Sequence, residues 1–329
     1  MQQVWLTSEI VNQKMLIKKI LPCFMTLFLG LASVSLAQAG VPDAIESDPN
    51  TMGWMKGFPP SDDRVIGHPA SDYFSFPKLR WTFCHFREIQ ATRRVARGRG
   101  PVSPLPESLD SAIDDLTFMP IGGDQTMTWQ ESLDANYTDG ILVLHRGQIV
   151  YEHYSGCLNA EGRHGAMSVT KSFVGTVAEI LIADGVLDDT KRVSEYVPEL
   201  KPSAFGSATV RQVMDMTAAL DYNENYADPE SDIWQYAAAG DPTPKPESYT
   251  GPRNFYEFLQ GVEQEGTHGK AFIYKSINTD ALAWVIARAS GKDFIEHLSE
   301  RIWKPLGMDQ EADMMIDSLG TPFSAGGLS

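Results

Sequence analysis

The pattern of hydrophobic and polar positions predicts a β-hairpin followed by a series of helices. Two runs rich in β-branched and aromatic residues flank the turn His145-Arg-Gly-Gln148, so a hairpin is expected over 139–154. A later segment that is apolar nearly all round predicts a buried helix over 168–183. Further helices, the first of them capped by Thr209, are expected over 210–216, 255–264, 281–291 and 294–303.

Residues 40–105 carry a different pattern, with many Pro, Gly and Ser residues and few periodic runs. Such a composition predicts a loop-rich N-terminal arm that wraps a core. An arginine-rich stretch over 87–99 has few aromatic residues between its charges, and we expect a solvated surface segment there. Burial of five aromatic residues is expected to pin the arm to the core: Phe74, Phe76, Trp81, Phe83 and Phe86.

Residues 1–39 have the three parts of a secretory signal peptide. Lys14, Lys18 and Lys19 precede an apolar run over 20–36, and Ala37-Gln-Ala39 matches an A-x-A cleavage site. The apolar run is short for a membrane span, and no basic stop-transfer cluster follows it. We therefore expect cleavage after Ala39, a periplasmic or secreted protein, and no stable membrane span after cleavage.

Composition narrows the possible function classes. The chain has 329 residues with 43% hydrophobic content, enough for a large core, and its net charge of −16 argues against nucleic acid as a partner. No group of cysteines and histidines has metal-ligand spacing, so neither a metal nor a cofactor is expected. Cys84 and Cys157 could pair in an oxidising compartment, but the sequence leaves open whether they lie close together. The oligomeric state is also open.

Candidate chemistry lies at the start of the predicted helix over 168–183. Ser168 and Lys171 are three residues apart, so they share one helix face and the amine can reach the serine oxygen. A serine hydroxyl becomes a good nucleophile when a neighbouring base takes its proton. The helix N-terminus adds backbone N–H donors that suit a developing oxyanion. Because such a short pattern also occurs by chance, its meaning depends on the rest of the chain.

Further stretches follow this pair in an informative order. They include Gly185-Val-Leu-Asp-Asp189, Thr209-Val-Arg-Gln-Val-Met-Asp-Met-Thr217, Tyr274-Lys-Ser276 and Pro305-Leu-Gly-Met308. From residue 135 onward, the order and spacing resemble the serine β-lactamase and penicillin-binding-protein-like superfamily, on its class C and esterase side. Class C β-lactamases have Tyr-x-Asn as the second motif. The Tyr-x-Ser form found here is similar to that of the 6-aminohexanoate-dimer (nylon-oligomer) hydrolases.

This resemblance implies an α/β (α+β) fold over a hydrolase domain at 106–329. An antiparallel sheet would be flanked by helices and would carry an inserted all-helical lobe. The implied function is an exported serine hydrolase that cleaves small amides or esters through an acyl-enzyme on Ser168. Lys171 or Tyr274 would accept the serine proton, and the choice between them stays open because the two groups would titrate as a unit.

The resemblance also implies residues that bind a small-molecule amide or ester substrate. Ser276 would orient Lys171 or the leaving group. Tyr222 would contact the scissile amide, and Asp232 would pair with a substrate ammonium group, with Tyr226 and Asp228 as alternatives. All four lie in a polar, acidic loop over 221–232. The natural substrate itself depends on loop shape and is not readable from the sequence.

Two alternatives stay open. One is a β-lactamase or D-alanyl-D-alanine carboxypeptidase/esterase, against which the Tyr-x-Ser motif and the 221–232 loop count. The other is an inactive homologue that serves as a binding protein. The sequence stops at Ser324-Ala-Gly-Gly-Leu-Ser329, inside an element that family members continue into the last sheet strands and a third, Lys/His-x-Gly motif. We therefore expect a C-terminally truncated member that lacks these strands and has little activity.

Overall fold

The structure of the chain is a computed structural model that describes residues 41–67 and 72–329. The predicted signal peptide at 1–39 lies outside the described residues. Within the described ranges, no helix is both long and apolar enough to span a membrane.

The predicted hairpin is confirmed. Strands β4 (Gly140–His145) and β5 (Gln148–Tyr154) pair antiparallel, with Gly140 opposite Tyr154 and His145 opposite Gln148. The two linking residues, Arg146 and Gly147, both have positive φ, as a two-residue hairpin turn of the primed type requires. Such a turn matches the right-handed twist of the strands, which explains why the sequence pattern predicted the hairpin.

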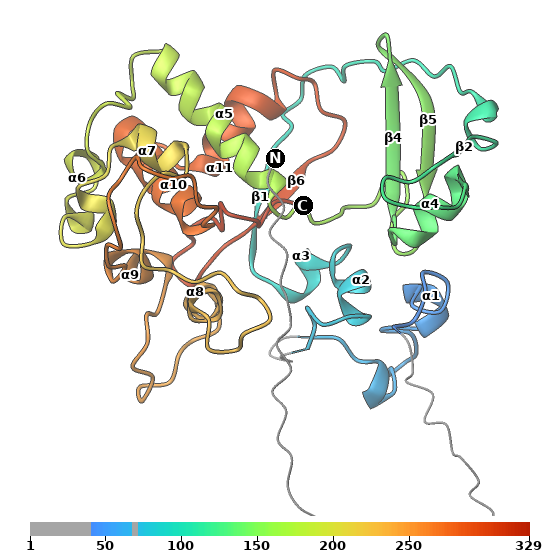
Figure 1. Ribbon diagram of the computed structural model, residues 1–329, viewed down its shortest axis with the longest axis horizontal. Coiled ribbons are helices and arrows are strands. Elements are labelled where there is room, and N and C mark those ends of the chain that lie inside the picture. The colour runs from blue at the N-terminus through green and yellow to red at the C-terminus, as the bar shows by residue number, and fades with distance from the viewer. Residues whose placement is uncertain (1–40, 68–71) are drawn as a thin grey trace, which may run out of the picture. The chain divides into compact units, whose positions relative to one another are not determined.

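The helices that follow the hairpin gather around α10, which contacts α5, α6, α7, α9 and α11 (Figure 1). Thr209 caps α7 as expected, since its hydroxyl accepts from the Gln212 amide in a capping box. After α11 the chain continues as a π-helix over Leu298–Trp303. The α-helices of this part are α5 (Val169–Ala183), α6 (Val193–Tyr196), α7 (Val210–Met214), α8 (Asp232–Gly240), α9 (Phe255–Gln260), α10 (Ile277–Ser290) and α11 (Phe294–His297).

The core lies where α5 and α10 meet. Every residue of α10 from Ile277 to Ile286 is buried, including Asp280. Helix α5 is buried along one face only: Val174 and Val177 face the core, whereas Ser172, Thr176 and Glu179 are exposed. The expectation of a helix buried all round is therefore wrong, because polar residues recur on one side of it.

The strands of the described part form three two-stranded antiparallel sheets. One of them is the β4–β5 hairpin. The second pairs β1 (Thr92–Val95) with β6 (Ala312–Met315), and the third pairs β2 (Thr117–Phe118) with β3 (Met127–Thr128). Helix α4 (Trp129–Ala135) follows β3 directly. Strand β1 belongs to the arginine-rich stretch that we expected to be solvated. Its pairing with β6 brings Arg93 to Asp293 and Arg94 to Glu311, so these arginines form ion pairs at the edge of the core.

The N-terminal arm carries short helices, α1 (Pro49–Met52), α2 (Lys78–Thr82) and α3 (Phe86–Ile89). Trp81 and Phe86 are buried as expected, and Phe76 and Phe83 are half-buried. The expected burial of Phe74 is wrong, because this ring remains 36% exposed. It covers the rings of Phe83 and Phe86 on one side and faces solvent on the other.

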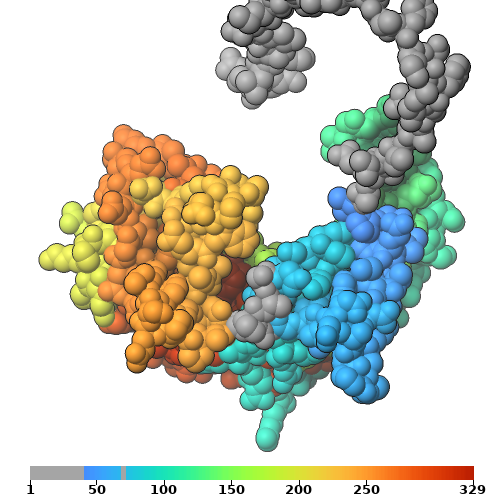
Figure 2. All heavy atoms as spheres, turned by 90° about the horizontal axis from the view of Figure 1, so that it is seen from below, coloured from blue at the N-terminus to red at the C-terminus, as the bar shows by residue number. Residues whose placement is uncertain are grey.

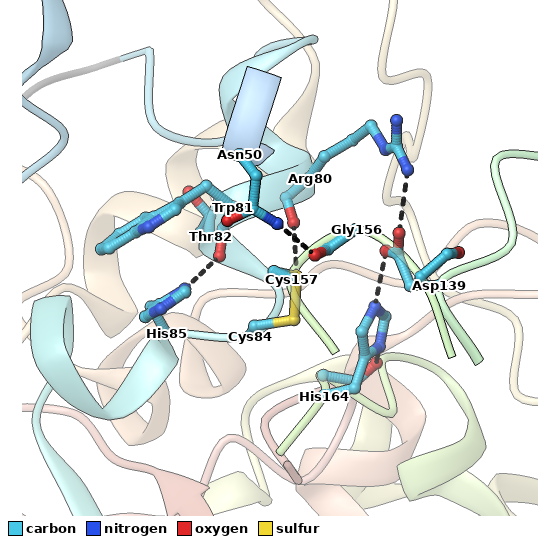
Figure 3. Close-up of a disulfide and its surroundings, with 12 residues drawn as sticks. Asn50, Arg80, Trp81, Thr82, Cys84, His85, Asp139, Gly156, Cys157 and His164 are labelled. Carbon is cyan, nitrogen blue, oxygen red and sulfur yellow. Dashed lines mark hydrogen bonds and ion pairs between the residues drawn. A yellow bond between two sulfur atoms is a disulfide. The ribbon is translucent and has the colours of Figure 1, made fainter. Parts of the chain in front are cut away.

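Cys84 and Cys157 form a disulfide that joins the arm to the segment after β5 (Figure 3). Beside this disulfide, the Asp139 carboxylate contacts two basic side chains. Arg80 donates to one carboxylate oxygen at 3.0 Å, and Nε2 of His164 lies 3.2 Å from the other. Because Arg80 and Asp139 are both buried, each supplies the partner that the other needs away from water.

The segment 323–329 packs against the start of α5. The Ala166 amide donates to the Leu328 carbonyl at 2.8 Å, and the Leu328 amide donates to Oγ1 of Thr170 at 3.3 Å. In Figure 2 the dark red C-terminal residues are visible in a depression between the yellow helical segments and the cyan arm. The residues on either side of Ser168 thus contact a segment far away in sequence.

Candidate active site

Ser168 occupies the N-cap position of α5 and is exposed. The residue before it, Met167, has φ 45°, in the left-handed region that non-glycine residues rarely adopt. The chain approaches Ser168 through Gly165, whose amide donates to the Phe83 carbonyl at 2.7 Å. A Cβ at Gly165 would lie 2.4 Å from Cε2 of Phe86, so the close packing of this segment on the arm requires glycine.

Lys171 meets Ser168 one helical turn later. Its Nζ lies 3.0 Å from Oγ of Ser168 and donates to the Ala325 carbonyl at 2.7 Å. The same Nζ lies 5.1 Å from the centre of the Tyr274 ring. The structure therefore brings together Ser168, Lys171 and Tyr274, the three residues that sequence analysis assigned to catalysis.

A cavity of about 610 Å³ opens at this point. Phe272 and Tyr274 line it and are 67% and 45% exposed. Met214 and Met216 line it as well, so its wall is largely apolar near the polar Ser168–Lys171 pair. An apolar wall beside a few polar groups is typical of small-molecule sites.

Ser276 faces a carboxylate rather than Lys171. Its hydroxyl donates to Oε1 of Glu224 at 2.6 Å, and its amide donates to Oε2 at 2.7 Å. The hydroxyl of Tyr226 donates to the same Oε1 at 2.8 Å. Glu224 thus ties the 221–232 loop to the start of α10, two residues after Tyr274. Sequence analysis did not single out Glu224, because it is one of several acidic residues in this loop.

Tyr222 and Asp232 lie on the same loop but in different surroundings. Tyr222 is buried with its ring edge-on to Phe258, and its hydroxyl has no hydrogen-bond partner within residues 41–67 and 72–329. Burial, followed by the nearby charge of Glu224, raises the pKa of Tyr222, so this phenol stays protonated. Asp232 begins α8 and accepts from the Asn223 amide at 2.8 Å. Neither residue lines the cavity beside Ser168.

Asp280 is a buried acid whose contacts lead to Lys171, and sequence analysis did not single it out. Its Oδ1 accepts from the amides of Ser324 and Ala325 at 2.8 and 3.3 Å, and its Oδ2 accepts from the hydroxyl of Tyr236. Burial raises its pKa to about 7, although the bond from Tyr236, the charge of Lys171 and the two amides act in the opposite direction. Asp280 follows Asn278 and Thr279 and directly precedes the helix expected over 281–291, so no signal in the sequence set it apart from an ordinary helix-capping acid.

No group of three or more His, Cys, Asp or Glu side chains in the described part of the chain could hold a metal ion. The side chains gathered at Ser168 offer a serine hydroxyl, an amine and a phenol.

Comparison with known proteins fits this geometry. A family model described as Beta-lactamase matches residues 131–310, which is more than half of the chain and includes Ser168, Lys171 and Tyr274. The chain belongs to the β-lactamase family. Its mixed fold of helices and small antiparallel sheets is β-lactamase-like, as the sequence predicted.

Two relatives of this family member carry a more particular similarity. The chain is 34% identical to a 6-aminohexanoate-dimer hydrolase from Paenarthrobacter ureafaciens over 279 residues, which cover 80% of this chain and 65% of that protein. A solved structure assigned as a 6-aminohexanoate-dimer hydrolase from Bacillus anthracis has a TM-score of 0.72 and 32% identity, covering 78% of this chain and 66% of that one. The chain thus spans just under two thirds of each of these relatives.

A more distant relative is a β-lactamase from Yersinia enterocolitica. It is 20% identical over 159 residues, which cover 48% of this chain and 36% of that protein. The similarity to the 6-aminohexanoate-dimer hydrolases therefore covers much more of this chain than the similarity to the Yersinia enterocolitica β-lactamase does.

Proposed function

We propose that this protein is a serine hydrolase that cleaves small amides or esters through an acyl-enzyme on Ser168. The observation that carries the proposal is the 3.0 Å separation of Nζ of Lys171 from Oγ of Ser168, at a helix N-terminus beside an open cavity. The 34% identity to a 6-aminohexanoate-dimer hydrolase supports a linear amide as the substrate class.

The proposed reaction has two halves. Oγ of Ser168 attacks the acyl carbon while its proton passes to Lys171 as a free amine or to Tyr274 as a phenolate. The carbon–nitrogen or carbon–oxygen bond of the substrate then breaks, and the leaving group takes up that proton. Water subsequently cleaves the acyl–Oγ bond and regenerates the serine hydroxyl.

The surroundings of Ser168 suit this chemistry. The Ser168 amide precedes the first helical residue, so it is one of the N-terminal donors without a partner inside the helix and can face an oxyanion. Lys171 is held by the Ala325 carbonyl and lies against the Tyr274 ring, which keeps its amine close to Oγ. Such fixed placement of a base lowers the entropic part of the barrier.

Export is part of the proposal. The Cys84–Cys157 disulfide supports it, because disulfides of this kind persist in oxidising compartments such as the periplasm or the medium. A mass measurement of the mature protein recovered from a secreting host would test cleavage after Ala39.

The central test is labelling by a fluorophosphonate probe, read by peptide mass spectrometry. We expect the adduct on Ser168 and its loss in Ser168→Ala. Ser172→Ala is the matched control, because Ser172 is exposed on the same helix one turn further on, and labelling should persist there. An unlabelled Ser168 in the folded protein would refute the proposal and favour a binding protein.

A second comparison tests the substrate class. Initial rates would be measured on 6-aminohexanoate dimer, p-nitrophenyl acetate and the β-lactam nitrocefin, with Ser168→Ala as the blank. We expect turnover of the linear amide or the ester to exceed that of nitrocefin. Faster hydrolysis of nitrocefin would instead assign the protein to the β-lactam-cleaving members of the family.

A further inference from the structure

We propose that Asp280 is a positioning residue that holds the turn at residues 324–325, so that the Ala325 carbonyl anchors Lys171 beside Ser168. This inference rests on the proposed function, because it assigns Lys171 a role in activating Ser168. It adds a residue from the first turn of α10 that does not line the cavity beside Ser168.

The contacts form a continuous path. Oδ1 of Asp280 accepts from the amides of both Ser324 and Ala325, and the carbonyl of Ala325 then accepts from Nζ of Lys171 at 2.7 Å. Residue 325 is thus held from both sides, through its amide by Asp280 and through its carbonyl by Lys171. Lys171 in turn lies 3.0 Å from Oγ of Ser168.

A side chain with hydrogen-bond acceptors suits this position better than an apolar one. Asp280 is only 4% exposed, so an isolated charge there would be costly, and its two oxygens are divided between different tasks. Oδ1 serves the 324–325 turn, whereas Oδ2 accepts the hydroxyl of Tyr236 from α8. A pair of adjacent amides directed at one carboxylate oxygen fixes the orientation of the turn as well as its place.

The far end of the turn is fixed independently. The Gly327 amide donates to the Phe323 carbonyl at 2.8 Å, and the Leu328 amide donates to Oγ1 of Thr170. These bonds keep the segment against α5. Within the turn, the Gly326 amide, which shares a peptide plane with the Ala325 carbonyl, donates to the Phe323 carbonyl at 3.2 Å. The two bonds to Asp280 attach this turn to α10, and thereby place the Ala325 carbonyl where Lys171 can reach it.

The test uses the fact that the two carboxylate oxygens have different partners, the 324–325 turn for Oδ1 and Tyr236 for Oδ2. Asp280→Ala removes the acceptor for the turn, Asp280→Asn keeps one amide oxygen that can take its place, and Tyr236→Phe removes only the bond to Oδ2. The rate constant of fluorophosphonate labelling at Ser168 would be measured for each variant in the full chain. Hydrogen exchange of the peptide that contains residues 324 and 325 would be measured in parallel.

We expect Asp280→Ala to lower the maximal labelling rate at least about tenfold with little change in the half-saturating probe concentration, because Lys171 loses its anchor while the cavity is unchanged. Asp280→Asn should retain most of the rate, and Tyr236→Phe should resemble wild type. Amide protection at residues 324–325 should fall in Asp280→Ala and persist in the other two variants.

If Asp280→Ala does not fold, the double variant Asp280→Val/Tyr236→Phe replaces both buried partners by apolar groups of similar shape and should fold while still losing the rate. Wild-type labelling in a folded Asp280 variant without the Oδ1 acceptor would overturn the proposal. So would an equal loss in Tyr236→Phe, since that pattern belongs to a residue that only stabilises the fold. Absence of labelling in wild type would instead refute the proposed function, and the exchange data would still report whether Asp280 holds the turn.

Discussion

The Cys84–Cys157 disulfide allows a stability prediction that depends only on chain topology. The two cysteines are 73 residues apart, and the bond closes a loop that contains α4 and the whole β4–β5 hairpin. In the chain-entropy description, a cross-link over a loop of this length removes about 15 cal/mol/K from the unfolded state. At 25 °C this entropy corresponds to a stabilisation of about 4 kcal/mol.

The perturbation is the double variant Cys84→Ser/Cys157→Ser. We expect its free energy of unfolding to fall by about 2–4 kcal/mol, the usual range for a disulfide of this kind. Urea unfolding followed by tryptophan fluorescence would measure the change, because Trp81 is buried close to Cys84 and stacks on His85. The denaturation midpoint and the slope together give the free energy.

A reductant supplies the matched control. It should move the wild-type midpoint to that of the double variant and should leave the double variant where it is. A double variant within about 1 kcal/mol of wild type would refute the reasoning, because the cross-link would then constrain too little of the unfolded ensemble. A shift of the double variant under reductant would show that the effect does not come from this disulfide.

Three further predictions concern the site. Gly165→Ala should lose about 1–3 kcal/mol, seen as a lower thermal midpoint, because the added Cβ would meet the buried Phe86 ring; an unchanged midpoint would contradict this packing. Tyr274→Phe should lower turnover of p-nitrophenyl acetate by about 10²–10⁴ if its hydroxyl transfers the proton, and near-normal turnover would leave Lys171 as the base. Burial raises the pKa of Asp280 to about 7, so the folded state keeps a proton that the unfolded state loses near pH 4. The free energy of unfolding of the wild type, relative to that of Asp280→Asn, should therefore fall as the pH rises from about 4 to about 7 and stay level above pH 7. A difference that does not change with pH would contradict the raised pKa.

Local features of the chain were predictable because local geometry decides them. The hairpin follows from two β-rich runs that flank a short turn containing Gly147, and the cap at Thr209 follows from a capping box that is visible in the sequence. The contact between Ser168 and Lys171 follows from helix periodicity alone. Each of these involves residues within one or two turns of each other.

The features that the sequence did not predict join distant segments. Strand β1 was read as a solvated arginine-rich stretch, because its partner strand β6 lies more than 200 positions later in the chain. The acids that pair with Arg93 and Arg94, which are Asp293 and Glu311, also lie in that late part. Ser276 was expected near Lys171, yet Glu224 takes both of its donors across a separation of 52 residues. A motif fixes which residue types are present, but tertiary partners decide where their polar atoms point.

This difference separates the two halves of the candidate site. One helical turn is sufficient to put Nζ of Lys171 within reach of Oγ of Ser168, so this contact is possible in any α-helix with the same pair. The groups that hold the amine in that place come from elsewhere: the Ala325 carbonyl from the 323–329 segment and the Tyr274 ring from the chain before α10. Substitutions that remove the Oδ1 acceptor of Asp280 should therefore lower the labelling rate of Ser168 without altering α5. In the proposed mechanism, that rate depends on the packing between α5, α10 and the 323–329 segment, and the Ser-x-x-Lys pattern alone does not determine it.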